Sequence, residues 1–180
     1  MHAKRTYEFS SFTVLIYTQS EFTRELVSDM CRAMRFKTVI SRSDFAGAWH
    51  AFTSTPIDIT FGDVAPDEGC RLLKDIRNDE ISPNPRIPFI ATALASSPAC
   101  ILRARDYGAT EFLRFPLSAG TLIDRVIHVV EHPRDFVKAS QYAGPDRRRR
   151  SRPVGGGDRR KQAPVAVDAA TSNLDQEWAV

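Results

Sequence analysis

Short apolar runs alternate with segments of helical periodicity between residues 12 and 131, and this alternation is the strongest constraint on the fold. The runs are rich in β-branched residues and too short for helices, which predicts buried strands. The five predicted strands are residues 12–17, 37–40, 57–61, 88–92 and 111–113, and the five predicted helices are residues 21–35, 43–52, 66–77, 97–108 and 118–131. Ser20 and Ser118 are predicted to cap the first and last of these helices. Apolar residues at helical spacing are expected on the buried helix faces, among them Phe22, Leu72, Leu73 and Ile76. Alternating strands and helices form a parallel sheet covered on both faces. We therefore expect an α/β flavodoxin-like (βα)5 fold with strand order 2-1-3-4-5.

The regular pattern ends at Pro133, which separates a folded part from a long C-terminal extension. A chain of 180 residues is typical of one domain with an extension. We expect an N-terminal arm over residues 1–11, one domain over 12–132, an arginine-rich ligand-binding segment over 133–163 and a terminal tail over 164–180. The extension is rich in glycine, proline and arginine and then poor in hydrophobic residues, which predicts disorder from about residue 138 onward without a ligand.

Positive charge is concentrated in this extension. Between Gly144 and Gln162 there are eight lysines and arginines against two aspartates, a local net charge of +6, while the whole chain carries +3. The rest of the chain is therefore near neutral or slightly acidic. The extension is the part of the chain that we expect to bind anions.

One short pattern, an aspartate followed by two arginines, occurs twice in the extension. The copies are Asp146-Arg147-Arg148 and Asp158-Arg159-Arg160, each preceded by residues that favour turns, Gly144-Pro145 and Gly155-Gly156-Gly157. Attraction to a generic polyanion needs only positive charge, so the paired acids indicate a more specific ligand. An arginine can fork onto guanine O6 and N7 or stack on the ring, and an aspartate can accept from guanine N1–H and N2–H. A two-fold anionic ligand with guanines, such as cyclic di-GMP, fits this pattern.

The expected contacts to cyclic di-GMP come from the whole basic segment. The candidate residues are Asp146, Arg147, Arg148, Arg149, Arg150, Ser151, Arg152, Gly157, Asp158, Arg159, Arg160 and Gln162. Arginines and backbone N–H groups would hold the phosphates. The two units would serve either two guanines of one ligand or the two ends of an intercalated ligand dimer. Tyr142 would either stack on a base or pack on the domain.

The remaining composition argues against membrane insertion and metal binding. The chain has no N-terminal apolar leader and no run of eighteen apolar residues, which predicts a cytoplasmic protein. Cys31, Cys70 and Cys100 have no metal-ligand or disulfide spacing, and we expect them to be buried or half-buried in helices. His50 and His128 have no neighbouring ligands in the sequence, so no metal is expected.

Residues 12–132 resemble the receiver domain of two-component response regulators. The resemblance depends on the segments that would surround strands one, three, four and five: Val14-Leu15-Ile16, residues 56–63, residues 87–90 and residues 108–116. In active receivers an acidic pair binds Mg²⁺, an aspartate accepts a phosphoryl group, and a hydroxyl residue and a lysine hold that group. Phosphoryl transfer needs a hard cation on oxygen ligands and neutralisation of charge.

Only one of these functional positions is kept. Asp63 matches the phosphoacceptor aspartate. The acidic pair is replaced by Thr18 and Gln19, the hydroxyl position falls on Ala93, and the lysine position falls on Phe115. The resemblance therefore implies a pseudo-receiver in which Asp63 is a vestigial phosphoacceptor. No nucleophile, base and metal are brought together in the sequence, so we expect a protein that is not an enzyme.

A degenerate receiver followed by an arginine-rich tail resembles the Cle subfamily of CheY-like cyclic di-GMP effectors. This resemblance implies that the tail binds cyclic di-GMP and that the ligand-bound protein is recruited to the flagellar pole. There it would dock on the flagellar motor switch protein, alter motility and promote surface attachment.

Two other functions stay open. The first is a phosphorylation-dependent single-domain response regulator, which the replaced Mg²⁺ ligands disfavour. The second is non-specific nucleic-acid binding through the basic tail. No helix-turn-helix pattern accompanies the tail, so no sequence-specific nucleic acid is expected.

Overall fold

In the computed structural model the described residues are 9–64, 68–78, 80–93, 97–147 and 165–167. The centre is a parallel sheet of β1 (Thr13–Tyr17), β2 (Thr38–Arg42), β3 (Ile59–Asp63), β4 (Phe89–Ala93) and β5 (Glu111–Arg114). The strand order is β2-β1-β3-β4-β5, as the sequence predicts. In the register, Val14 of β1 lies between Val39 of β2 and Ile59 of β3.

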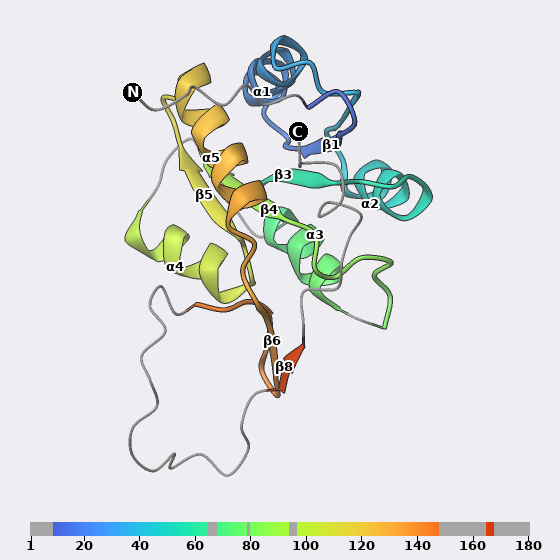
Figure 1. Ribbon diagram of the computed structural model, residues 1–180, viewed down its shortest axis with the longest axis vertical. Helices are drawn as coiled ribbons and strands as arrows, with labels where there is room; N and C mark the ends of the chain where they lie inside the picture. The colour runs from blue at the N-terminus through green and yellow to red at the C-terminus, as the bar shows by residue number, and fades with distance from the viewer. Residues whose placement is uncertain (1–8, 65–67, 79, 94–96, 148–164, 168–180) are drawn as a thin grey trace.

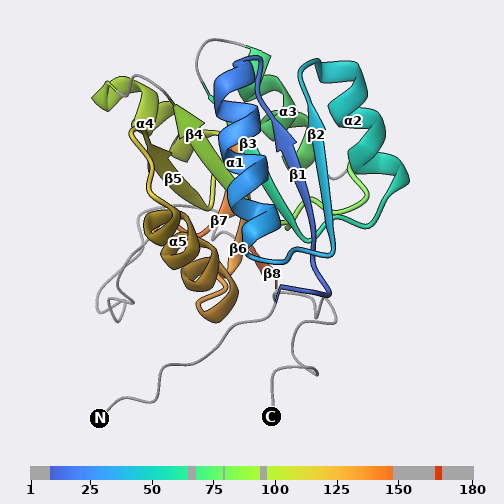
Figure 2. The ribbon, with the colours of Figure 1, turned by 90° about the horizontal axis from the view of Figure 1, so that it is seen from above.

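Five helices cover the two faces of this sheet (Figures 1 and 2). They are α1 (Glu21–Ala33), α2 (Phe45–Ser54), α3 (Glu68–Arg77), α4 (Pro98–Asp106) and α5 (Ala119–Glu131). Residues of α1 and α5 pack with Val14 and Ile16 on one face, and residues of α2, α3 and α4 pack with Leu15 and Tyr17 on the other. Successive residues of a strand point to opposite faces, so β1 contributes to both cores. No described helix is long and apolar enough to cross a bilayer.

Local capping fixes where several helices begin. Ser20 and Ser118, both predicted as caps, accept hydrogen bonds from the backbone N–H groups of Thr23 and Thr121. Asp44 and Ser97 cap α2 and α4 in the same way. Each cap satisfies an N–H group that has no partner within its helix.

The buried face of α1 differs from the apolar pattern. Phe22 was assigned to the apolar stripe but is 65% exposed. The helix instead buries Thr23, Val27 and Cys31. Thr23, Val27 and Cys31 are spaced four positions apart and lie on one face of the helix, and Phe22 lies outside that face.

A second, three-stranded antiparallel sheet follows α5 (Figure 1). Its strands are β6 (Phe136–Ala139), β7 (Tyr142–Pro145) and β8 (Val165–Val167), in the order β7-β6-β8. The prediction of disorder from residue 138 is therefore wrong for residues 138–147. Gly144 and Pro145 are also not turn residues but the end of β7. Proline is tolerated there because β7 is an edge strand.

Two glycines let the β6–β7 hairpin dock closely on the domain. Gly108, just after α4, has a φ of +90°, and a Cβ atom there would lie 2.8 Å from the carbonyl oxygen of Ala143. A Cβ atom on Gly144 would lie 2.8 Å from the Cα atom of Gly108 and 2.6 Å from the hydroxyl of Tyr142. Any side chain at either position would push the hairpin away. Glycines often mark places where two backbone segments approach closely, so Gly108 and Gly144 were an indication of this contact in the sequence.

Candidate functional site

The carboxyl edge of the parallel sheet carries the remnant of the receiver site. Asp63 ends β3, and its carboxylate accepts a hydrogen bond of 3.5 Å from the hydroxyl of Thr18, which follows β1. Thr18 is buried, and its backbone carbonyl accepts from the guanidinium of Arg24. The same hydroxyl accepts from the backbone N–H of Ser20, the cap of α1. Thr18 is thus held in place by hydrogen bonds and is not a free ligand.

The other positions around Asp63 carry no charge suited to phosphoryl transfer. Ala93 ends β4 and is buried, and Phe115 packs against the core beneath α1 and α5. Gln19 is exposed and offers only a neutral amide. Within the described ranges, no three histidine, cysteine or acidic side chains are grouped so that they would hold a metal ion. Among the described residues at this edge, Thr18, Ala93 and Phe115 offer no carboxylate that could join Asp63 around a Mg²⁺ ion.

Opposite this edge, a buried arginine supports the hairpin. Arg77, the last residue of α3, donates to the carbonyls of Gly108 at 2.9 Å, Pro85 at 2.6 Å and Ile87 at 2.8 Å. Its guanidinium also lies 5.9 Å from the ring of Phe136 in β6. Burial lowers the pKa of Arg77 to about 10, so it stays charged at neutral pH. Sequence reasoning missed this residue, because its partners lie in two separate loops, one before β4 and one after α4.

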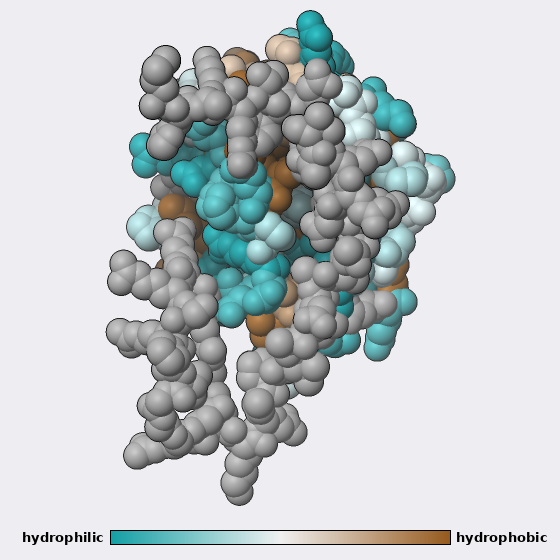
Figure 3. Space-filling model, viewed as in Figure 1, coloured by the Kyte–Doolittle hydropathy of each residue, from teal (hydrophilic) through white to brown (hydrophobic). Residues whose placement is uncertain are grey.

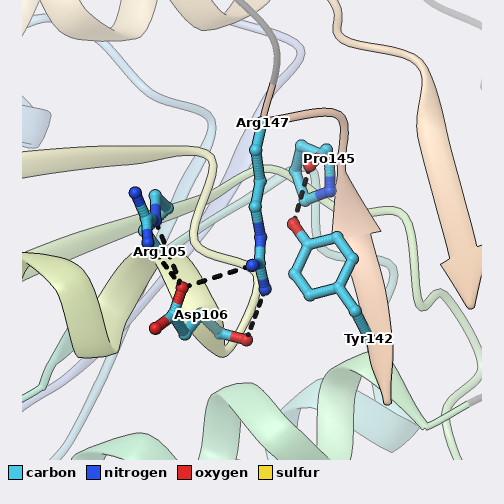
Figure 4. Close-up of polar contacts among 5 residues, drawn as sticks. All are labelled: Arg105, Asp106, Tyr142, Pro145 and Arg147. Carbon is cyan, nitrogen blue, oxygen red and sulfur yellow. Dashed lines mark hydrogen bonds and ion pairs between the residues drawn. The ribbon is translucent and has the colours of Figure 1, made fainter. Parts of the chain in front are cut away.

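The first aspartate–arginine unit begins where β7 ends. The guanidinium of Arg147 lies 3.7 Å from the centre of the Tyr142 ring (Figure 4). Its Nη1 atom is 3.3 Å from the Asp106 carboxylate, and its Nη2 atom donates to the Asp106 carbonyl at 3.1 Å. The Tyr142 hydroxyl donates to the carbonyl of Pro145 at 2.7 Å, which fixes the ring. We call Asp106, Tyr142 and Arg147 the Arg147 junction.

The Arg147 junction also completes the end of α4. Asp106 is the last residue of that helix, where a negative charge is unfavourable to the helix dipole. Arg105 and Arg147 both pair with its carboxylate, and Arg147 caps its carbonyl. Of the two predicted roles of Tyr142, packing at the domain surface is the one present here, and one ring face is covered by Arg147.

A groove of about 360 Å³ lies beside the junction, between the ends of α3 and α4 and the turn of the hairpin. Its walls include Lys74, Lys138, Tyr107 and Tyr142. The ammonium group of Lys74 lies 4.2 Å from the centre of the Tyr107 ring. The groove therefore presents cations next to aromatic rings, close to the start of the basic segment.

Most of the predicted ligand contacts lie outside the described residues. Asp146 and Arg147 are described, and the backbone N–H of Asp146 donates to the Asp135 carbonyl at 2.7 Å. The predicted contacts outside the described residues are Arg148, Arg149, Arg150, Ser151, Arg152, Gly157, Asp158, Arg159, Arg160 and Gln162. The structure thus fixes where the segment starts and leaves its other contacts as predictions.

The face formed by α4, β5 and α5 combines apolar and charged side chains. Ile101 and Leu102 of α4 are 43% and 48% exposed. Glu111 of β5 is nearly buried and lies 2.7 Å from Arg134, 3.5 Å from Arg125 and 3.6 Å from the ring of His128. Arg134 precedes β6, so its ion pair also attaches the hairpin to this face. On the face of the molecule shown in Figure 3, the visible described surface is mostly hydrophilic, with small separate hydrophobic areas.

Comparisons with known proteins agree with this architecture. No protein-family model matches the chain, and no curated protein matches it. Among solved structures, chemotaxis protein CheY4 of Vibrio cholerae superposes with a TM-score of 0.59 and 21% identity, covering 66% of this chain and 98% of that one. A response regulator from Thermotoga maritima has a TM-score of 0.59 and 22% identity, covering 67% and 98%. A histidine-kinase receiver domain from Syntrophus aciditrophicus has a TM-score of 0.58 and 19% identity, covering 68% and 92%.

These similarities define the fold of the domain. It is the CheY-like receiver fold of response regulators, shared with distant structural relatives. About two thirds of this chain covers 98% of each of these two relatives, so about one third of the chain has no counterpart in them.

Proposed function

We propose that this chain is a non-enzymatic cyclic di-GMP effector in which the arginine-rich segment binds the ligand and the receiver domain docks on a partner. The observation that carries the proposal is the duplicated aspartate–arginine–arginine unit, whose first copy begins at the Arg147 junction. An acid beside each arginine pair supports recognition of guanine edges rather than of phosphate alone. The tail resembles that of the Cle effectors, most closely the CleD member.

The carboxyl edge of the sheet supports a switch other than phosphorylation. Asp63 contacts the hydroxyl of Thr18 where an active receiver needs a metal held by carboxylates. Transfer of a phosphoryl group to Asp63 would lack both charge neutralisation and a positioned cation. Ligand binding to the tail would not require phosphorylation of Asp63.

The second sheet supports a role for the basic segment as a loop closed at both ends. Phe136 of β6 pairs with Pro145 of β7 on one side and with Val167 of β8 on the other. The strands that precede and follow the basic segment in the sequence, β7 and β8, thus both pair with β6. Holding both ends of a binding segment lowers the entropy lost when it wraps a ligand.

The partner proposed for the domain is the flagellar motor switch protein, reached through the face of α4, β5 and α5. Ile101 and Leu102 supply an apolar centre, and Arg125 and Arg134 supply charge at its edge. Apolar centres with polar rims are typical of protein interfaces. Ligand binding would neutralise the tail next to this face, and the cytoplasmic protein would then be recruited to the flagellar pole.

Calorimetric titration of the full chain with cyclic di-GMP, GTP and a short DNA duplex tests the proposal. We expect saturable binding of cyclic di-GMP, weak binding of GTP, and DNA binding that disappears as salt rises. The variants Asp146→Ala and Asp158→Ala separate guanine recognition from charge attraction, because each removes a negative charge. Weaker binding in both supports guanine recognition. Tighter binding in both would reject it in favour of a polyanion-binding tail.

A further inference from the structure

Arg147 is engaged on both its edge and its face in the absence of a ligand. Both terminal nitrogens contact Asp106, one at the carboxylate and one at the backbone carbonyl. One face of the guanidinium covers Tyr142 at 3.7 Å. The two terminal nitrogens are the donors that would form a bidentate contact with guanine O6 and N7 or with a phosphate. In this structure Asp106 occupies both donors (Figure 4).

We infer that Asp106 competes with cyclic di-GMP for Arg147, so that a residue of the receiver domain sets the affinity of the tail for its ligand. The inference rests on the proposed function and adds a way in which the affinity for the ligand is regulated. In the free protein Arg147 caps α4. In the bound protein its two terminal nitrogens turn to the ligand, and Asp106 keeps only Arg105.

The energetic balance makes such an exchange feasible. The side chain of Arg147 is 37% exposed and that of Asp106 is 49% exposed. An ion pair at this exposure is weak, because water and salt screen it. Asp106 also keeps its contacts with Arg105, at 3.2 Å from Nε and 3.0 Å from Nη2, after Arg147 leaves. No charge is therefore left unpaired when the exchange takes place.

The exchange connects the tail with α4. Arg147 donates to the carbonyl at the carboxyl end of that helix, and Asp106 is its last residue. Withdrawal of Arg147 removes a cap and a compensating charge from α4. The same helix exposes Ile101 and Leu102. A partner that binds α4 in the uncapped state would favour ligand binding, because coupling between two sites is reciprocal.

A double-mutant cycle on the full chain tests the competition. Asp106→Ala should bind cyclic di-GMP about two- to five-fold more tightly than the wild type, the range for loss of an exposed ion pair. The control is Asp75→Ala, which removes one negative charge from a partly exposed pair with Arg71 at 3.9 Å. In an Arg147→Ala background, Asp106→Ala should have no more effect than Asp75→Ala.

A second measurement reads the contact without any ligand. Trypsin must take the arginine side chain into its own pocket, so cleavage after Arg147 requires that Arg147 leave Asp106. The fragment ending at Arg147, identified by its mass, should appear sooner in Asp106→Ala than in the wild type, and at the wild-type rate in Asp75→Ala.

The outcomes separate the two proposals. A wild type that does not bind cyclic di-GMP overturns the proposed function, and the competition with it. A wild type that binds, together with equal affinities in Asp106→Ala and Asp75→Ala, overturns the competition alone. Weaker binding in Asp106→Ala also overturns it, because Asp106 would then position Arg147 for the ligand.

Discussion

The two edges of the parallel sheet differ in what they can do. At the carboxyl edge, Asp63 contacts a buried threonine hydroxyl, and the neighbouring Ala93 and Phe115 are part of the core. At the amino edge of β4 and β5, Arg77 holds the loops before β4 and after α4, and a hairpin docks there through the contact of two glycines. Arg147 and Asp106, at the same edge, are partly exposed.

In open α/β sheets ligands usually bind beyond the carboxyl ends of the strands. Here the residues needed at that end have been replaced by neutral ones, and the additional structure is at the opposite end. Under the proposed function, the receiver fold keeps its core, and the ligand binds a segment attached at the other edge. The experiments below test each edge in turn.

The largest expected effect comes from removing the support of the hairpin. Arg77→Ala leaves the carbonyls of Gly108, Pro85 and Ile87 without a donor inside the protein. We expect a loss of roughly 3 kcal/mol or more in the free energy of unfolding, measured by urea denaturation. The control is Arg71→Ala, an exposed arginine on the same helix, which should change stability by less than about 0.5 kcal/mol. Equal losses in both variants would show that Arg77 does not support this edge.

Substitutions in the repeated unit should act on ligand affinity and not on stability. Arg148→Ala, Arg159→Ala and Arg160→Ala should each weaken binding of cyclic di-GMP by roughly 1–3 kcal/mol, the range for a bidentate contact to a base. Calorimetry measures the affinity, and Arg32→Ala on α1 is the control for charge. Uniformly small losses that match the control would indicate binding by charge alone.

The glycine contact can be broken with little change in the parallel sheet. Gly144→Val places a side chain against the Cα atom of Gly108 and the Tyr142 hydroxyl. We expect a loss of roughly 1–3 kcal/mol from overpacking, with faster hydrogen exchange in β6 and β7. Gly120→Ala is the matched control, since its nearest neighbour would be the Ser118 hydroxyl at 3.8 Å. Unchanged exchange in the hairpin of Gly144→Val would refute the close docking.

Removal of β8 should have a smaller effect, on the affinity for the ligand. A chain ending at residue 164 lacks β8, while one ending at residue 168 keeps it. We expect the shorter chain to bind cyclic di-GMP a few-fold more weakly, roughly 0.5–1 kcal/mol, because one end of the segment is released. Identical affinities would mean that closure by β8 does not assist binding.

At the carboxyl edge we expect no phosphorylation of Asp63. Incubation with acetyl phosphate and Mg²⁺ should leave no acyl phosphate on Asp63, as judged by intact mass, because the cation lacks its ligands. Asp63→Asn provides the background. A modification present in the wild type and absent from Asp63→Asn would restore phosphorylation as the switch.

Local patterns in the sequence were sufficient for the parallel sheet, its five helices and the caps at Ser20 and Ser118. They also placed Leu72, Leu73 and Ile76 in the core, where all three are fully buried. These features depend on periodicity and on contacts between residues three or four positions apart, which a single segment contains. The loss of the metal ligands was equally visible, because it concerns residue types at known positions.

Only the tertiary structure showed that a hairpin follows α5 and how it contacts the domain. The hairpin strands have four residues each, too few for a clear alternating pattern, and Gly144-Pro145 resembles a turn when read alone. Arg147 meets Asp106 across 41 positions, and Arg77 meets Gly108 across 31. The exposure of Phe22 likewise depends on which face of α1 packs against the sheet. Such contacts depend on which surfaces packing brings together, and no local periodicity encodes that choice.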